Sequence, residues 1–180
     1  LTIDQAMYDF ISGYTAKIAG TEAGITEPTT TFSACFGKPF LPLHPMSYAL
    51  MLGEKLKKEP VSVWLVNTGW TGGSYGFGER IALTHTRALI AAALAGELEG
   101  VEYARDRTFN LSVPKSCPGV PAELLNPESQ WADAYQYQLT AKKLAAAFIK
   151  NFKQYKDYAT EAIRQAGPQI RTVHDIPSIK

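Results

Sequence analysis

The sequence lacks an excess of charge of either sign, since 18 Lys and Arg residues stand against 17 Asp and Glu residues, a net charge of +1. A field this weak does not attract a phosphate backbone, which argues against general nucleic-acid binding. With 46% hydrophobic and 19% charged residues, the composition is that of a globular core rather than a disordered segment. A length of 180 residues suits one domain or one large piece of a bigger one.

Cysteine is nearly absent as well. Cys35 and Cys117 lie far apart and belong to no CxxC pair, so the sequence predicts neither a disulfide framework nor a structural zinc site, and a cytoplasmic protein is expected. The longest apolar run, 88–96, is about half as long as a membrane span, so no membrane association is expected. An initiator Met and a signal peptide are also missing. We therefore expect a chain cut from a longer one.

Hydrophobic spacing predicts the elements of the first third. Apolar residues recur at three- and four-residue steps from Ile3 to Ala19, which predicts an amphipathic helix that Gly20 ends. The stretch 21–45 is rich in Thr, Gly and Pro and has no period, so a long loop is expected. A second helix is predicted to begin at His44 or Pro45 and to end before Pro60.

The next stretch, VSVWLV at 61–66, is predicted to be a strand buried on both faces, because it is apolar, rich in β-branched residues and bounded by Pro and Gly. Thr84 is expected to cap a helix from His85 to Ala95. The remaining predicted elements are a strand and two helices, at 109–113, 137–155 and 158–166. Helix, buried strand, loop and helix in this order favour an α/β domain, and the tail, 171–180, is expected to be loosely held.

The loop after the predicted strand reads NTGWTGGSYGFGERI, with five glycines and three aromatic residues. Neither phosphate-binding motif fits it. Glu79 and Arg80 stand where a Walker A loop needs Lys and Ser or Thr, and Ile81 stands where the dinucleotide fingerprint needs its third glycine. A glycine-rich turn between strand and helix is the simpler interpretation. Arg80 favours the alternative, because a planar guanidinium stacks on a nucleotide base or pairs with a carboxylate.

The other polar residues define no further site. The three histidines, His44, His85 and His174, fit no metal-binding spacing, and no Ser-His-Asp or Cys-His grouping follows from the positions alone. The residues by themselves therefore predict an α/β domain with a functional glycine loop and nothing more specific.

Four stretches together resemble the ATP-dependent phosphoenolpyruvate carboxykinases. They are GYTAKIAGTEAGITEPTTTFSACFGKPF at 13–40, LVNTGWTGGSYGFGERI at 65–81, THTRALIAAALAGELEG at 84–100 and FNLSVPKSCPGVPAELLNP at 109–127. The resemblance runs in order to residue 170 and covers roughly the C-terminal third of such an enzyme. The glycine run and the threonine-rich loop resemble the ATP-using branch rather than the GTP-using branch.

This resemblance implies that residues 1–170 are part of a C-terminal mononucleotide-binding lobe. The enzyme would convert oxaloacetate and ATP to phosphoenolpyruvate, ADP and CO2 in gluconeogenesis, with a divalent metal, Mg2+ or Mn2+. The resemblance places Arg80 against the adenine base, Ile81 beside it, and a hydrogen bond from Thr86 at the helix start. The glycines would let the backbone approach the base and ribose.

The resemblance also implies that residues 21–45 close over the bound nucleotide as a lid, which would exclude water from phosphoryl transfer. An ordered surface loop is the alternative. The residues singled out for the lid are Thr21, Glu22, Gly24, Thr26, Glu27, Thr31 and Phe32.

The family's phosphate loop, metal ligands and oxaloacetate-binding arginines match nothing in this chain, so no catalytic residue and no metal ligand is assigned to it. They would lie in the missing N-terminal portion. Because phosphoryl transfer depends on placing the phosphates and the metal, the chain alone is predicted not to turn over oxaloacetate. Two alternatives stay open: a stand-alone adenine-nucleotide-binding module without catalysis, and an unrelated α/β domain whose glycine loop is only a turn.

Overall fold

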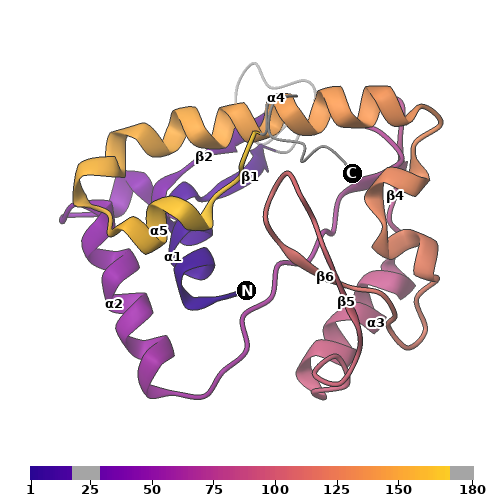
Figure 1. Ribbon diagram of the computed structural model, residues 1–180, viewed down its shortest axis with the longest axis horizontal. Coiled ribbons are helices and arrows are strands. Elements are labelled where there is room, and N and C mark those ends of the chain that lie inside the picture. The colour runs from indigo at the N-terminus through magenta and orange to yellow at the C-terminus, as the bar shows by residue number, and fades with distance from the viewer. Residues whose placement is uncertain (18–28, 171–180) are drawn as a thin grey trace, which may run out of the picture.

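In the computed structural model, residues 1–17 and 29–170 are described. Helices and small antiparallel sheets alternate along this part of the chain (Figure 1), which confirms the α/β expectation in its coarse form. The helices are α1 (Ile3–Ser12), α2 (Pro45–Lys58), α3 (Leu83–Leu94), α4 (Ala134–Phe152) and α5 (Glu161–Ala166). The paired strands are β1 (Tyr14–Lys17) with β2 (Thr29–Phe32), β3 (Trp70–Thr71) with β4 (Glu79–Arg80), and β5 (Tyr103–Arg105) with β6 (Ser112–Pro114). The predicted tail, 171–180, lies outside the described residues.

Four helices, α1, α2, α4 and α5, pack around the larger of two apolar cores. Its buried residues include Ile11 and Ile163, both with no exposed surface, and Tyr8, whose ring stacks on Phe152 at 4.4 Å between centroids. Figure 1 shows α4 running along one side of the molecule, above α1 and α5. The predicted α2 and the predicted stop of α5 before Gly167 are confirmed.

Helix α1 is shorter than predicted. Thr2 and Gln5 form a capping box at its start, but the helix ends at Ser12 and not at Ala19. Gly13 adopts φ +54°, and a Cβ there would lie 1.7 Å from the carbonyl oxygen of Ser33, so only glycine permits this ending. The residues that follow pair with β2 instead of continuing the helix.

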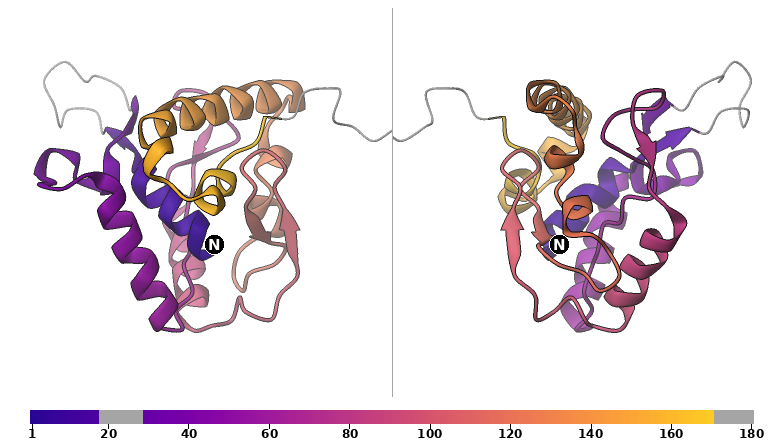
Figure 2. Two further views of the ribbon diagram at one scale, coloured as in Figure 1. Left: turned by 60° about the vertical axis from the view of Figure 1, so that its left-hand side comes forward. Right: turned by 90° about the vertical axis from the view of Figure 1, so that its right-hand side faces the viewer.

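The smaller core lies under α3. Its buried residues are Ala92, Leu98, Cys117 and Val120. The helix begins at Leu83 rather than His85, and its N-cap residue is Ala82, which provides no side-chain hydrogen bond. The prediction that Thr84 caps this helix was therefore wrong. Figure 2 shows α3 on the opposite side of the molecule from α4 and α5.

The predicted buried strand at 61–66 was also wrong. Residues 60–68 run as an extended connection from α2 to β3, without a strand partner in the described part of the chain (Figure 1). Val61 is 59% exposed and Leu65 is 54% exposed. Composition predicts that such a segment can form a strand, but a strand also needs a hydrogen-bonding neighbour.

The turn of the β5–β6 hairpin is hydrogen-bonded to helix α1 and to the residues that follow α5. The side-chain amide of Gln5 donates to the carbonyl oxygen of Asn110 at 2.6 Å, and the amide of Gln169 donates to the carbonyl oxygen of Thr108 at 2.8 Å. Asn110 has φ +61° and sits in the turn between the strands. The strand predicted at 109–113 accordingly begins only at Ser112.

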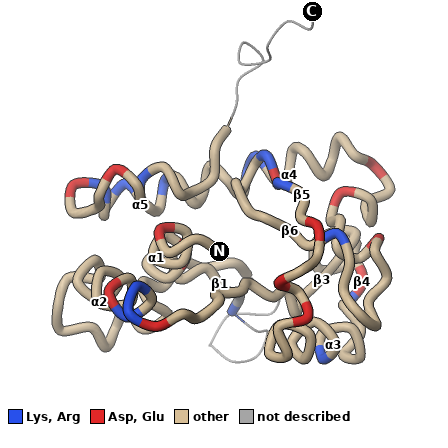
Figure 3. Tube along the Cα trace, turned by 60° about the horizontal axis from the view of Figure 1, so that its bottom comes forward, with Lys and Arg blue, Asp and Glu red and all other residues tan. Residues whose placement is uncertain are grey.

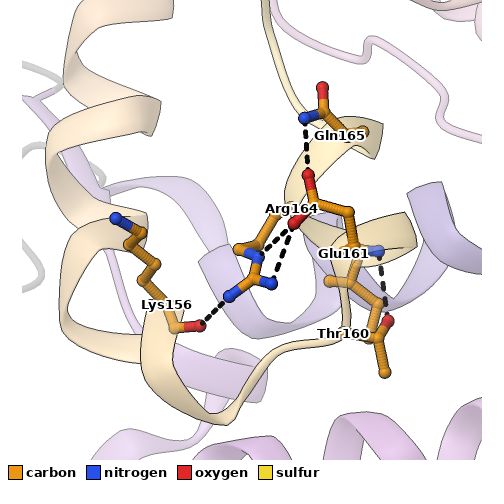
Figure 4. A network of polar contacts seen from close by, with 6 residues as sticks. Lys156, Thr160, Glu161, Arg164 and Gln165 are labelled. Atoms are coloured by element: carbon orange, nitrogen blue, oxygen red, sulfur yellow. Dashed lines mark hydrogen bonds and ion pairs between the residues drawn. The ribbon is translucent and has the colours of Figure 1, made fainter.

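A local network anchors the short helix α5 (Figure 4). Thr160 caps the helix by accepting from the amide of Ile163 at 3.3 Å, and Arg164 binds Glu161 through two nitrogens at 2.9 and 2.8 Å. Arg164 also donates to the carbonyl oxygen of Lys156, and Gln165 donates to Glu161 at 2.7 Å. These bonds hold the turn that places Ile163 in the larger core.

Charges of both signs are interspersed over the described part of the chain, for instance along α2 and α5 (Figure 3). Within residues 1–17 and 29–170, no helix combines the length and the apolarity that crossing a bilayer requires.

Asp9 gives the larger core a dependence on pH. Its carboxyl group lies beside an apolar cavity of about 190 Å3 that Leu65, Phe109 and Phe148 help to line. Burial raises the pKa of Asp9 to about 6, although the N-terminal amine of Leu1 favours the charged form. Since the folded pKa is the higher one, Asp9 contributes stability below pH 4 that is lost as the pH rises through about 6.

We therefore expect Asp9→Asn, which removes the buried charge, to raise the melting temperature at pH 7 and to flatten its change between pH 4 and 6. Thermal unfolding followed by circular dichroism across this pH range tests the expectation. Asp157→Asn, at an exposed aspartate, is the matched control and should keep the wild-type profile. An Asp9→Asn protein that melts below the wild type at pH 7 would contradict the assignment.

Candidate functional site

The glycine-rich stretch forms a β-hairpin, not a turn from strand to helix as the sequence predicted. Trp70 pairs with Arg80, and Thr71 pairs with Glu79. Asn67 organises the entry to the hairpin: its Oδ1 accepts from the amide of Gly69 at 2.9 Å, and its Nδ2 donates to the carbonyl oxygen of Trp70 at 3.2 Å. The hairpin leads within three residues from Arg80 to the first turn of α3.

Packing inside the hairpin explains several of its glycines. A Cβ on Gly78 would lie 2.5 Å from the carbonyl oxygens of Gly73 and Thr71, so the two sides of the loop approach too closely for any side chain. Gly72 has φ +72°, and a Cβ there would lie 2.9 Å from the carbonyl oxygen of Gln130. The hairpin itself therefore requires Gly78, and the approach of Gln130 requires Gly72, whatever else binds nearby.

Arg80 is held from one side by an aromatic ring. Its guanidinium carbon lies 4.8 Å from the centroid of the Trp70 ring, and Trp70 in turn contacts Tyr75 edge-on at 5.6 Å. Arg80 is exposed, whereas Trp70 is half-buried. Such a cation–π contact restrains a long, flexible side chain and contributes about 0.5–1 kcal/mol at an exposed site. The arrangement thus presents a positioned, planar cation at the surface.

Trp70 is the residue that sequence reasoning missed. The signal that could have found it is cross-strand register: if the glycine run is a hairpin, the tryptophan before it and the arginine after it lie opposite each other.

The other two residues predicted to contact adenine, Ile81 and Thr86, lie close in sequence but differ in exposure. Ile81 is half-buried, and its amide donates to the carbonyl oxygen of Gly69 at 3.0 Å, which fixes it at the base of the hairpin. Thr86 lies in the first turn of α3 and is only 8% exposed. The structure therefore offers Arg80 directly to solvent and keeps most of Thr86 covered.

Of the residues predicted for the lid, only Thr31 and Phe32 belong to the described part of the chain. Both are in β2, so the expectation of one long loop over 21–45 was wrong for this end of it, and two 3₁₀ turns follow at 34–36 and 38–40. The Phe32 ring packs 5.4 Å from Tyr14 and 5.1 Å from Phe148. Phe32 therefore anchors the end of the segment in the larger core. The other predicted lid residues, Thr21, Glu22, Gly24, Thr26 and Glu27, lie outside the described residues.

A cavity lies elsewhere in the described chain. It measures about 560 Å3 and is lined by residues of the β5–β6 hairpin and the turns that follow, including Arg105, Arg107, Lys115 and Glu128. None of Arg80, Ile81 and Thr86 lines it. Several of its charges are already satisfied, because Arg105 binds the side chain of Asn110 and Lys115 pairs with Glu102 at 3.0 Å. Of the three predicted contacts for a base, Arg80 is exposed, Ile81 is half-buried and Thr86 is buried.

Metal-binding side chains do not gather in the described residues, where no three His, Cys, Asp or Glu residues lie close enough to hold an ion.

His44 has a structural role: its Nδ1 accepts from the amide of Met46 at the start of α2. Both cysteines are free thiols, as predicted, and burial raises the pKa of Cys35 to about 11.

Comparison with known proteins gives one consistent result. A sequence model of the phosphoenolpyruvate carboxykinase family matches residues 1–123. The relative from Caldanaerobacter subterraneus, a phosphoenolpyruvate carboxykinase (ATP), is 60% identical over 169 residues, which is 94% of this chain. The enzymes of the same name from Christiangramia forsetii and Thermus thermophilus are each 56% identical over 93% and 94% of it. The chain spans 32% of the length of each of these relatives.

Proposed function

Because this chain belongs to the ATP-dependent phosphoenolpyruvate carboxykinase family, we propose that it supplies the adenine-binding part of an enzyme that converts oxaloacetate and ATP to phosphoenolpyruvate, ADP and CO2. In this proposal the chain is part of the C-terminal mononucleotide-binding lobe of a cytoplasmic enzyme of gluconeogenesis. The remaining polypeptide of such an enzyme would be its partner. The alternative is a stand-alone module that binds adenine nucleotides without catalysis.

The observation that carries the proposal is the exposed guanidinium of Arg80 on the Trp70 ring. A guanidinium held over one aromatic ring can receive an adenine ring on its other side, since both surfaces are planar and the contact is a cation–π interaction. Because Arg80 pairs with Trp70 across the hairpin, the strand register fixes the position of Arg80 relative to the Trp70 ring. Little side-chain freedom is then lost when a base binds, which favours affinity.

Ile81 and Thr86 would complete the adenine site. Ile81 follows Arg80 directly and offers an apolar side chain beside the ring. Thr86 would donate or accept one hydrogen bond at the edge of the base, after a small movement that uncovers its hydroxyl. Within the proposed lid segment, 21–45, the part that precedes Phe32 would then close over the nucleotide, with Phe32 as its fixed end.

Phosphate and metal chemistry would come from elsewhere in the enzyme. The described residues do not fit a divalent ion, because they contain no cluster of three metal-binding side chains, so we assign no metal ligand in them. Mg2+ or Mn2+ would be bound by polypeptide outside this chain. Phosphoryl transfer requires both the ion and the phosphates to be positioned, so we expect the chain alone to show no oxaloacetate decarboxylation.

Isothermal titration with a series of ligands tests the proposal. If the chain contacts only the adenine end, AMP, ADP and ATP should bind with dissociation constants within about tenfold of one another, a difference of 1.4 kcal/mol. Inorganic tripolyphosphate, which lacks the base, should neither bind nor compete. Competition by tripolyphosphate, or the absence of any AMP binding, would contradict the adenine site.

A further inference from the structure

The tip of the glycine hairpin is a tight turn that folds back on itself. The carbonyl oxygen of Ser74 accepts hydrogen bonds from the amides of Phe77, at 3.0 Å, and Gly78, at 2.8 Å. Gly76, the third of the four turn residues, has φ +87°, the left-handed conformation that this position of a type II β-turn requires. The turn therefore fixes the backbone from which Tyr75 and Phe77 project.

The two aromatic side chains of this turn have different surroundings. The Tyr75 ring lies edge-on against the Trp70 ring, with 5.6 Å between their centroids and 83° between their planes. Phe77 is 91% exposed and makes no ring contact with the described part of the chain. Of the two side chains, only Tyr75 is thus folded back onto β3, the strand that carries Trp70.

Trp70 links the turn to the proposed adenine site. The guanidinium carbon of Arg80 lies 4.8 Å from the centroid of the Trp70 ring, and Tyr75 contacts the same ring edge-on. A cation–π contact depends on the cation lying over the face of the ring, so rotation of the Trp70 ring would displace the guanidinium. An edge-on aromatic neighbour opposes that rotation, because aromatic pairs are favoured only in particular orientations.

We propose that Tyr75 is a positioning residue for the adenine ring. By holding the Trp70 ring, it keeps the Arg80 guanidinium in the orientation that receives the base, and it acts through these two residues without touching the nucleotide. The inference rests on the proposed function, in which adenine stacks on Arg80. It gives the reason why an exposed arginine on a strand of two residues is ordered before the nucleotide arrives, and a side chain ordered in advance loses less freedom on binding.

Nuclear magnetic resonance of the ligand-free chain tests the positioning step by itself. Because the Arg80 guanidinium lies over the Trp70 ring, the ring current should shift its Nε–H proton upfield, and Arg80→Lys, which removes the signal, assigns it. We expect Tyr75→Leu to abolish about half of this shift or more, because the ring that orients Trp70 is lost. Tyr75→Phe should retain the shift, since only the hydroxyl group is removed. Phe77→Leu, at the other aromatic residue of the turn, is the matched control and should retain it too.

Titration calorimetry with AMP tests the consequence for binding. Tyr75→Leu should weaken AMP binding by about three- to tenfold, whereas Tyr75→Phe and Phe77→Leu should bind AMP as the wild type does. Because Tyr75 acts through Arg80, adding Tyr75→Leu to Arg80→Ala should cause no further loss. A role only in holding the hairpin together would instead lower the affinity in both backgrounds.

An unchanged Arg80 signal in Tyr75→Leu would overturn the proposal, and so would equal AMP affinities of Tyr75→Leu and the wild type. Neither result would affect the adenine site itself. An equal loss of affinity in Tyr75→Phe would assign the effect to the hydroxyl group and overturn the role of the ring. If the wild type does not bind AMP, the proposed function fails, and the role of Tyr75 fails with it.

Discussion

Replacing Phe148 by Ala should destabilise the chain by about 3–5 kcal/mol, the range measured for truncating a buried aromatic residue. The Phe148 ring lies 5.0 Å from Tyr14, 5.1 Å from Phe32 and 6.4 Å from Phe109. It therefore joins α4 to the β1–β2 pair and to the β5–β6 hairpin. It also borders the cavity of about 190 Å3, which truncation would enlarge rather than fill.

Urea unfolding checks this value. Leu139→Ala is the matched control, because Leu139 lies on the same helix but is 36% exposed, and it should cost less than about 1 kcal/mol. A loss of about 3–5 kcal/mol is a large part of the stability of a small domain, so the alanine variant can fail to fold. In that case Phe148→Leu, which retains more apolar volume, is measured in its place. Equal urea midpoints for Phe148→Ala and Leu139→Ala would show that Phe148 does not hold the core together.

Replacing Arg80 by Ala should weaken AMP binding by about tenfold or more, because a desolvated cation–π contact contributes about 2 kcal/mol. The side chain is exposed, so its removal should leave the fold intact. Arg80→Lys keeps the charge but loses the plane that stacks on a base, and it should recover only part of the affinity. Titration calorimetry with AMP measures each variant.

Arg87→Ala is the control for charge alone, since Arg87 is an exposed arginine on the neighbouring helix. It should bind AMP as the wild type does. An unchanged affinity in Arg80→Ala would support the reading of the glycine loop as a simple turn. An equal loss in both variants would mean that net charge, and not a stacked base, determines binding.

Local signals predicted the helices well where the boundary residues themselves set the ends. Pro45 follows the N-cap His44 of α2, and Gly167 follows α5. Helix α1 was predicted to be too long because its apolar period continues beyond Gly13, whereas the close contact of Gly13 with Ser33 ends the helix. A contact between residues 20 positions apart leaves no mark on hydrophobic periodicity.

The predictions for the segment 61–66 and for the glycine hairpin were wrong because strand pairing is not determined by the local sequence. The first has the composition of a strand but no neighbour within the described chain. The second contains strands of only two residues each, Trp70–Thr71 and Glu79–Arg80, which are too short to show alternation. Arg80 could be singled out from the sequence, but its partner Trp70 emerges only from the register between them.

Photolabelling with 8-azido-ATP tests the central claim most directly, because the reactive group is on the adenine ring. The account predicts that peptide mapping finds the label between Gly69 and Thr86, that excess AMP prevents labelling, and that Arg80→Ala reduces it. Label on the residues around the cavity of about 560 Å3, such as Arg105 and Arg107, would place the nucleotide there and contradict the adenine site at the hairpin.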